Sequence, residues 1–315
     1  MTDNIIELDN VVIPFRIENA AVRGEIARLK SSINDVLKDH NYPEVIAKMV
    51  AKMVILTSLL GSSIKFKGRL IIQTQTSGPL NMLVVDYHTD GNYENAGKFR
   101  ASARFNKKAL AALETTSDAE LLGTGQMVIT IDQGGDMKEY QGIVALDNIS
   151  LEEAARQYFG KSEQMLTEIR LAAEFDKDNK TWNAGGLMIQ SVAAQGGSNA
   201  ELDEEELKEQ QIADWENARA LMLTVKDNEL ISDKNDSQGL LFQLFHEKGV
   251  RCYMPQPLEA FCQCSVERIE DMLSQFSQQE RVEMAQENPK KPGYIQVACD
   301  FCGKEYEFTA EHFSQ

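Results

Sequence analysis

The chain is poor in the residues that mark disulfide-rich secreted proteins and nucleic-acid-binding proteins. Its 315 residues include only five cysteines, an odd number that argues against a static disulfide framework. Basic residues are also scarce, because 32 Lys and Arg stand against 49 Asp and Glu, a formal net charge of −17. A surface this acidic repels phosphate backbones, so we expect no nucleic-acid partner.

No secretory leader and no membrane-spanning run are apparent. The N-terminal stretch MTDNIIELDNVVIPF lacks a basic segment followed by an apolar core. The most apolar run, residues 45–60, is short for a bilayer span and contains Lys48 and Lys52. We therefore expect a buried helix there, no membrane partner, and a cytoplasmic protein whose thiols stay reduced.

Motifs that would indicate common enzymes are missing as well. The sequence contains no GxxxxGK[ST], no GxSxG and no HExxH, and it has no internal repeat or low-complexity tract. With 43% hydrophobic and 26% charged residues, it has the composition of an ordinary soluble globular protein. We expect a protein that is not an enzyme.

The first predicted part, residues 1–193, is an α+β domain in which an antiparallel sheet packs with helices. Apolar spacings of three and four predict an amphipathic helix over 17–37, and a second, central helix begins near Pro43. Ser150 is expected to cap a later helix. Short β-rich runs punctuated by Gly, Pro and Asn predict strands at 69–76, 82–88, 99–105, 127–132, 140–146, 167–175 and 182–191.

Two further parts follow. Residues 194–239 are predicted to be a helical acidic linker close to the limit of order, since twelve acidic and only four basic residues lie within 195–239. The alternative is an ordinary solvated helix. Residues 240–315 are predicted to be a small zinc-binding domain, with a helix over 265–283 and a hairpin over 294–308.

Four of the five cysteines form two tight pairs in this third part. Cys262 and Cys264 are separated by one residue, Cys299 and Cys302 by two, and 34 residues lie between the pairs. Four thiolates at tetrahedral distance make a closed zinc site without a position for substrate water. We therefore predict that these four residues bind one Zn²⁺ per chain. The spacing alone favours a purely structural role for this ion, and a coincidental grouping of surface thiols is the other alternative.

The remaining candidate ligands are not needed for such a site. Four cysteines already complete the shell, so His246 and His312 are predicted not to be ligands. Cys252 lies outside the motif and is predicted to be a semi-buried bystander. Gly303, directly after the second pair, permits the tight turn that a zinc knuckle requires.

The spacing also makes a redox switch possible. A segment of about seventy residues rarely obtains more than about 3–5 kcal/mol from its core. A structural zinc ion contributes on the order of 10–16 kcal/mol in small metal peptides. Each pair is close enough in sequence to form its own disulfide, which would remove the thiolates that zinc needs. Oxidation would then unfold this segment, and the marginal acidic segment beside it could follow.

At these residues the sequence resembles the redox-regulated heat-shock chaperone family of thirty-three kilodaltons, bacterial zinc-thiol holdases. The resemblance covers nearly the whole chain. It is carried by stretches such as HNYPEVIAKMV and GRLIIQTQTSGPLNMLVVDY in the first part, and by LFHEKGVR, FCQCSVERIEDML and VACDFCGKEYEF in the last. The gap between the cysteine pairs is longer than in many members, which we interpret as a loop insertion.

The resemblance implies an ATP-independent chaperone of the stress response that is inactive when reduced and zinc-bound. It implies that oxidants convert the ligands into Cys262–Cys264 and Cys299–Cys302 disulfides, with loss of zinc and unfolding of the switch. It also implies that the active protein holds unfolding client proteins and forms a homodimer. These are expectations from the family.

Two other functions are consistent with the cysteines. A thiol–disulfide oxidoreductase would use CDFC as its active site and would place Cys299 at a helix N-terminus, where its thiolate is stabilised. A structural zinc ribbon could bind nucleic acid, although the net charge of −17 disfavours that partner.

Overall fold

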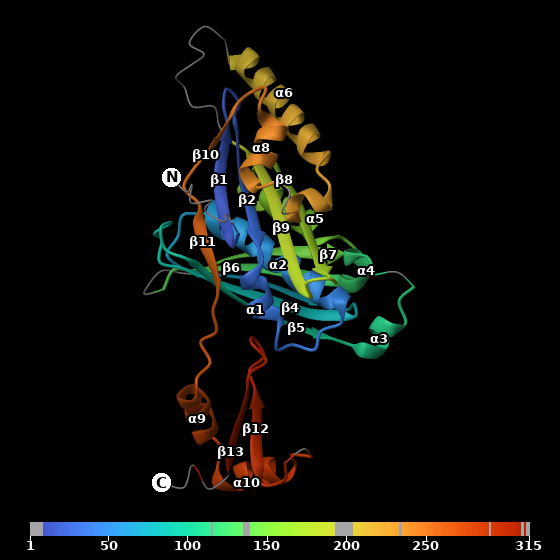
Figure 1. The fold of residues 1–315 in the computed structure, drawn as a ribbon, viewed down its shortest axis with the longest axis vertical. Helices are drawn as coiled ribbons and strands as arrows, with labels where there is room; N and C mark the ends of the chain where they lie inside the picture. The colour runs from blue at the N-terminus through green and yellow to red at the C-terminus, as the bar shows by residue number, and fades with distance from the viewer. Residues whose placement is uncertain are drawn as a thin grey trace.

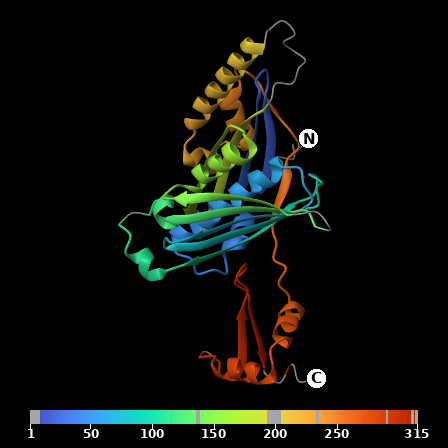
Figure 2. The same cartoon turned by 180° about the vertical axis from the view of Figure 1, so that it is seen from behind.

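A computed structural model describes residues 9–114, 116–134, 139–192, 204–232, 235–289, 291–309 and 312. It contains one large sheet with helices on its faces and a smaller C-terminal module, residues 261–309, that lies at one end (Figures 1 and 2). The first 10 residues of the predicted linker, 194–203, lie outside the described residues. The predicted α+β fold is confirmed.

The described strands pair almost entirely in antiparallel fashion, as predicted. The sheet order is β7-β6-β3-β4-β5-β11-β1-β2-β9-β8, with β10 paired to β1, and the β12–β13 hairpin is separate. The pair formed by β5 and β11 is parallel. The strands are β1 Val11–Ile17, β2 Val22–Leu29, β3 Gly68–Thr76, β4 Leu80–Thr89, β5 Gly97–Phe105, β6 Thr124–Asp132, β7 Tyr140–Asp147, β8 Thr167–Asp176, β9 Thr181–Ser191, β10 Val250–Cys252, β11 Gln256–Ala260, β12 Tyr294–Ala298 and β13 Glu305–Thr309.

The helices lie along both faces of the sheet and in the C-terminal module. They are α1 Ser31–Leu37, α2 Glu44–Ser63, α3 Lys107–Ala111, α4 Asp118–Leu122, α5 Leu151–Tyr158, α6 Glu204–Leu223, α7 Asp227–Ile231, α8 Ser237–Phe245, α9 Val266–Ser274 and α10 Gln278–Gln286, with the π-helical turn η1 Phe159–Glu163 after α5. Ser150 caps α5 as predicted, since its side chain accepts a hydrogen bond from the Glu153 N–H.

Helix α2 is the centre of the main core. It is long and apolar enough to cross a membrane, but 89% of its apolar window is buried inside the protein. The helix starts after Pro43, whose extended backbone suits the position before a first turn. Side chains from both halves of the large sheet pack against it, from Val12 to Leu146. Figure 1 shows α2 between the steep strands β1, β2, β9 and β8 and the flatter strands β3 to β7.

The prediction of a helix over residues 17–37 was wrong. The segment contains β2 and only the short helix α1. Val22 and Ile26 are four residues apart, which fits a helix, but they also lie on one face of a strand. Leu29 packs on the opposite face, against α2, so both faces of β2 are buried and no alternation of apolar and polar residues marks it. The predicted helix over 265–283 is likewise two helices, because Ser277 caps α10 after a break.

Helices α6, α7 and α8, here called the cover helices, lie over the outer face of one half of the sheet (Figure 1). Trp215, Met222, Leu230 and Phe245 are among their buried side chains. The sheet residues beneath them are called the covered face and comprise Val11, Ile13, Phe15, Ile17, Val22, Ile26, Ala172, Leu187 and Ile189. The described part of the acidic segment is therefore helical. Its apolar side packs on the sheet, and its other side is strongly charged.

A buried carboxyl group makes the stability of the sheet dependent on pH. Glu25 on β2 is 4% exposed, and burial raises its pKa to about 8 against the smaller opposing effect of Arg23. The folded state therefore binds a proton that the unfolded chain has already released above about pH 4.5. The free energy of unfolding should fall from there up to about pH 8 by about 1.4 kcal/mol per pH unit. Below about pH 4.5, Glu25 is protonated in both the folded and the unfolded state, so this loss of stability is absent.

Replacing Glu25 with glutamine should remove that slope, because the amide does not titrate. Chemical denaturation between pH 5 and 8 measures the effect as the difference between the variant and the natural protein. We expect the difference to change by roughly 3 kcal/mol over this range. Parallel curves for the two proteins would show that Glu25 is ionised in the folded state.

Candidate metal centre

Two loops bring the four cysteines together. Cys262 and Cys264 lie between β11 and α9, and Ser265 fixes the end of that loop by accepting a hydrogen bond from the Arg268 N–H at the start of α9. Cys299 and Cys302 lie in the turn that joins β12 to β13, as predicted. The local sequence thus places each pair beside a rigid element.

The second pair depends on a glycine in the left-handed region. Gly303 has φ +70°, and its N–H donates to the Cys299 carbonyl oxygen at 2.8 Å. The Cys299 N–H donates to the Lys304 carbonyl oxygen at 3.0 Å, which closes the turn. A residue with a Cβ atom would be strained at this φ, so the glycine following CDFC is required by the turn.

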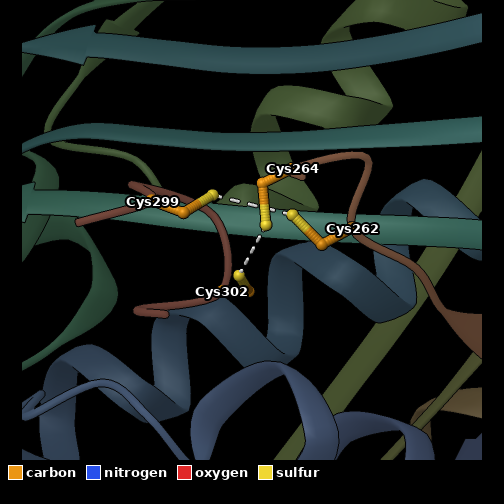
Figure 3. Close-up of side chains that lie close together, drawn as sticks. All are labelled: Cys262, Cys264, Cys299 and Cys302. Carbon is orange, nitrogen blue, oxygen red and sulfur yellow. Dashed lines mark hydrogen bonds between the residues drawn. The ribbon is translucent and has the colours of Figure 1, made fainter. Parts of the chain in front are cut away.

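The four sulfur atoms form a compact cluster (Figure 3). All four Sγ atoms lie within 4.8 Å of one another. Two of the distances are 3.6 Å, between Cys262 and Cys299, and 3.4 Å, between Cys264 and Cys302. A tetrahedral ion with metal–sulfur bonds of about 2.3 Å separates its ligands by about 3.8 Å. The four cysteines are therefore positioned to hold a metal ion.

The thiols differ in how easily they ionise. Burial opposes ionisation of Cys264, but the Tyr306 hydroxyl donates a hydrogen bond to its sulfur at 3.2 Å, and with the neighbouring thiols this lowers its pKa to about 7. Burial raises the pKa of Cys262. Burial and the adjacent thiols raise the pKa of Cys302. A cation at the centre of the cluster would lower the raised pKa values of Cys262 and Cys302, because a metal ion favours the thiolate form of its ligands.

The hydrophobic core next to the cluster is very small. Its described buried members are Ile269, Leu273, Ala285, Ile295, Tyr306 and Phe308. Six side chains cannot supply the stability of a large core, and modules of this size usually depend on a metal or on disulfides. The cluster is thus placed where a metal ion would contribute most to folding.

The turn that carries Cys299 and Cys302 also contacts the large domain. Arg104 on β5 forms an ion pair with Asp300 at 2.7 Å, and the Arg100 guanidinium lies over the Phe301 ring at 4.1 Å from its centroid. The His40 ring is 3.2 Å from the Phe301 carbonyl oxygen. In Figure 3 the turn lies in front of strands of the large sheet. A change in this turn therefore directly affects groups of the large domain.

The first cysteine pair is connected to the same region through the main chain. Strand β11 pairs in parallel with β5, with Ala260 opposite Phe99, and the Phe261 N–H donates to the Phe99 carbonyl oxygen at 2.8 Å. Cys262 follows immediately. Both loops of the cluster are thus attached to β5, one by strand pairing and the other by side-chain contacts.

Adding a methyl group at Gly303 should separate the turn from the large domain. A Cβ atom there would lie 2.5 Å from the Asp39 carbonyl oxygen, in addition to the strain at positive φ. Gly293→Ala is the matched control, because Gly293 has φ +91° and no atom within 4 Å of its missing Cβ. We expect the free energy of unfolding to fall by about 1–3 kcal/mol more in Gly303→Ala than in the control.

Hydrogen–deuterium exchange of residues 38–42 measures this separation. Exchange there should accelerate in Gly303→Ala and remain unchanged in Gly293→Ala. Equal exchange in both variants would mean that the turn does not hold this loop.

The other sequence-predicted candidates lie elsewhere. Cys252 is on β10, opposite Phe15 of β1, and burial raises the pKa of its thiol. His246 lies against the Phe242 carbonyl oxygen at 3.2 Å, and His312 contacts the Glu270 carboxylate at 2.6 Å. Among the described residues, the group that can hold a metal contains cysteines only. The CDFC pair lies in a β-turn and not at a helix N-terminus.

Sequence patterns did not reveal Tyr306 or the contacts of the turn with the large domain. Tyr306 lies on β13 with its hydroxyl on Cys264, and nothing in its spacing from the cysteines indicates that contact. Arg104 and Asp300 are 196 positions apart. Their pairing follows only from the way in which β11 brings the module to β5.

Comparison with known proteins gives a consistent result. A sequence model of the family described as "Hsp33 protein" matches residues 10–309. The chain is 39% identical over 306 residues to the 33 kDa chaperonin of Caulobacter vibrioides (strain NA1000 / CB15N), covering 95% of each chain. It is 34% identical over 297 residues to the 33 kDa chaperonin of Proteus mirabilis (strain HI4320), covering 94% of this chain and 92% of the relative.

A solved structure has the same fold. The crystal structure of a 33 kDa chaperonin, a heat shock protein 33 homolog from Thermotoga maritima, matches with a TM-score of 0.72. The match covers 97% of both chains at 18% sequence identity.

Proposed function

This chain belongs to the Hsp33 protein family, and we propose that it is a redox-regulated, ATP-independent holdase. In this proposal the reduced protein is inactive, and oxidation of the four clustered thiols makes it bind unfolding client proteins. The observation that carries the proposal is the cluster itself: four sulfur atoms within 4.8 Å, in a module whose described core has six buried side chains.

Zn²⁺ is the ion that we propose for the reduced state, held by Cys262, Cys264, Cys299 and Cys302. Four thiolates suit zinc, which prefers closed tetrahedral sulfur shells in structural sites. A zinc ion supplies folding free energy to the module when bound. Tyr306 would keep its hydrogen bond to the Cys264 sulfur and so orient that ligand.

Oxidation removes the ligands. Each disulfide forms when two thiols give up two electrons and two protons, and peroxide accepts both to become two molecules of water. We propose the pairs Cys262–Cys264 and Cys299–Cys302. The two sulfur distances given above, 3.6 and 3.4 Å, join one cysteine of each pair to one of the other. The pairing therefore needs peptide mapping by mass spectrometry under oxidising conditions.

Loss of the site is proposed to release the cover helices. Unfolding of the module would end its contacts with β5 and loosen the chain that runs back through β11 and β10 to α8. The apolar covered face beneath the cover helices would then become available to clients. A contiguous apolar surface of this kind is typical of a protein-binding site.

The ion pairs of the cover helices suit reversible release. Glu168 on β8 is buried and accepts from Arg219 of α6 and from Arg156 of α5. When α6 leaves, Arg156 remains with Glu168, so this buried carboxylate keeps one of its two partners. Removing a sole partner from a buried charge would cost about 3–5 kcal/mol.

The remaining parts of the proposal follow from the family and the composition. We propose that residues 1–193 are the chaperone core, 194–239 the releasable linker and 240–315 the switch, although β10 and β11 of the third part pair with β1 and β5. We also propose a cytoplasmic protein that is not an enzyme, that forms a homodimer when oxidised, and that has no nucleic-acid or membrane partner.

Light scattering from a thermally unfolding client protein tests the proposal. Oxidised protein should suppress aggregation at near-equal molar ratio, whereas reduced, zinc-loaded protein should not. A Cys252→Ser variant should behave like the natural protein. Equal suppression in both redox states would refute the switch, and substoichiometric reduction of insulin would indicate an oxidoreductase.

A further inference from the structure

An arginine on the covered side of the sheet holds main-chain carbonyl groups of the cover. Arg28 on β2 is 6% exposed, in line with Val22 and Ile26 of the covered face. Its guanidinium donates to the carbonyl oxygens of Glu229 at 2.8 Å, Ser232 at 2.8 Å and Asn235 at 2.6 Å. These three carbonyl groups lie at the end of α7 and in the chain that follows it.

The same segment places a leucine on the sheet beside Arg28. Leu230 is fully buried, within the hydrophobic cluster that includes Ala172 and Leu187. Its carbonyl oxygen would lie 2.3 Å from a Cβ atom at Gly185, which is directly opposite Arg28 in the pairing of β2 with β9. The missing side chain at Gly185 thus lets a polypeptide backbone lie directly on the strand.

Resting on the proposed function, we propose that Arg28, Gly185 and the pocket of Leu230 form a client-binding subsite. Its ligand would be an unfolded polypeptide segment that offers one apolar side chain and neighbouring main-chain carbonyl groups without partners. In the closed protein, Leu230 and the carbonyl groups of Glu229, Ser232 and Asn235 occupy this subsite as an internal ligand. Release of the cover helices would vacate it for the client.

The chemistry of the subsite suits a chaperone that must distinguish unfolded from folded chains. Folded proteins pair more than nine tenths of their buried carbonyl groups internally, whereas an unfolded chain offers free carbonyl groups at every residue. A guanidinium presents five N–H donors and stays charged at all physiological pH values. Recognition through the backbone would require only an apolar side chain from the client sequence.

A labelled synthetic peptide with the sequence of residues 224–236, TVKDNELISDKND, is the direct probe. Fluorescence anisotropy should show that it binds oxidised protein and does not bind reduced protein, where the chain's own segment fills the subsite. The same peptide with Leu230→Ala should bind about tenfold more weakly, because a buried leucine side chain is lost. Equal binding of the two peptides, or equal binding to both redox states, would overturn the proposal.

A protein variant provides the second arm. Arg28→Gln, measured in the oxidised state, should bind the peptide about tenfold or more weakly, because three charge-assisted hydrogen bonds are lost. Arg23→Gln is the matched control, since Arg23 is on the same strand and donates to Gln190. Equal weakening in both variants would overturn the subsite, and if Arg28→Gln does not fold, the peptide arm still decides.

The two arms separate this proposal from the proposed function. If the natural protein suppresses aggregation only when oxidised but neither substitution weakens peptide binding, the holdase stands and the subsite does not. If aggregation is not redox-dependent, the holdase fails before the subsite is reached.

Discussion

Replacing Cys299 with serine should unfold the C-terminal module even under reducing conditions. Serine is a poor ligand for zinc, so the site would lose one of its four thiolates. The described core of the module has six buried side chains and provides little stability of its own. The contribution at stake is on the order of 10 kcal/mol, the value typical of structural zinc in small peptides.

Three measurements follow the change. Zinc content should fall from about one ion per chain to near zero, and limited proteolysis should cut within residues 262–309. The variant should suppress client aggregation without oxidant, because loss of the ligand mimics oxidation. Cys252→Ser is the control, since Cys252 is on β10, opposite Phe15 of β1, and lies outside the cluster. A folded, zinc-free and inactive Cys299→Ser protein would contradict the switch.

Replacing Trp215 with alanine should open the cover without affecting the cysteines. Trp215 is on α6, is 5% exposed, and packs in the hydrophobic cluster formed by the cover helices and the covered face. Truncating a buried tryptophan costs about 3–5 kcal/mol. That is a large share of the stability of a helix attached only along one side. We expect α6 to detach while zinc remains bound.

The expected result is suppression of client aggregation by the reduced protein. Ile212→Ala is the matched control, because Ile212 is on the same helix but is 62% exposed. This variant should leave the reduced protein inactive, and its free energy of unfolding should stay within about 0.5 kcal/mol of the natural protein's. If reduced Trp215→Ala retains zinc, loses its α6 contacts and still does not bind clients, the covered face is not the client-binding surface.

Sequence patterns predicted the elements that have one polar face or a clear boundary. The strands from residue 68 to 147 alternate and are separated by Gly, Pro and Asn, and their predicted positions agree with β3 to β7 within a few residues. Helix α2 was recognisable because it is apolar all round and starts after Pro43. Side-chain caps such as Ser150 and the turn glycine Gly303 could be recognised from local rules alone.

Elements buried on both faces could not be predicted in this way. Strand β2 has apolar residues on both sides because α2 and the cover helices enclose it, and its spacing then imitates a helix. Strand β11 joins the sheet in parallel beside β5, a contact between residues about 160 positions apart that no local pattern encodes. Tertiary packing decides both.

The candidate site shows the same division. The spacing of the cysteines indicated that Cys262, Cys264, Cys299 and Cys302 belong together, and the structure brings their sulfur atoms within 4.8 Å. The residues that connect the cluster to the rest of the protein were not predictable. Arg104 and Asp300 act through a contact between distant segments, and each is an ordinary charged residue in the sequence.

The most direct test of the switch is zinc release measured against thiol loss during peroxide titration at mild heat. A colorimetric chelator reports the zinc, and a thiol reagent reports the cysteines in the same samples. We predict that one zinc is released per chain as four thiols disappear, together with the gain of client binding. Zinc that stays bound after the protein has been oxidised and has become active would contradict the account.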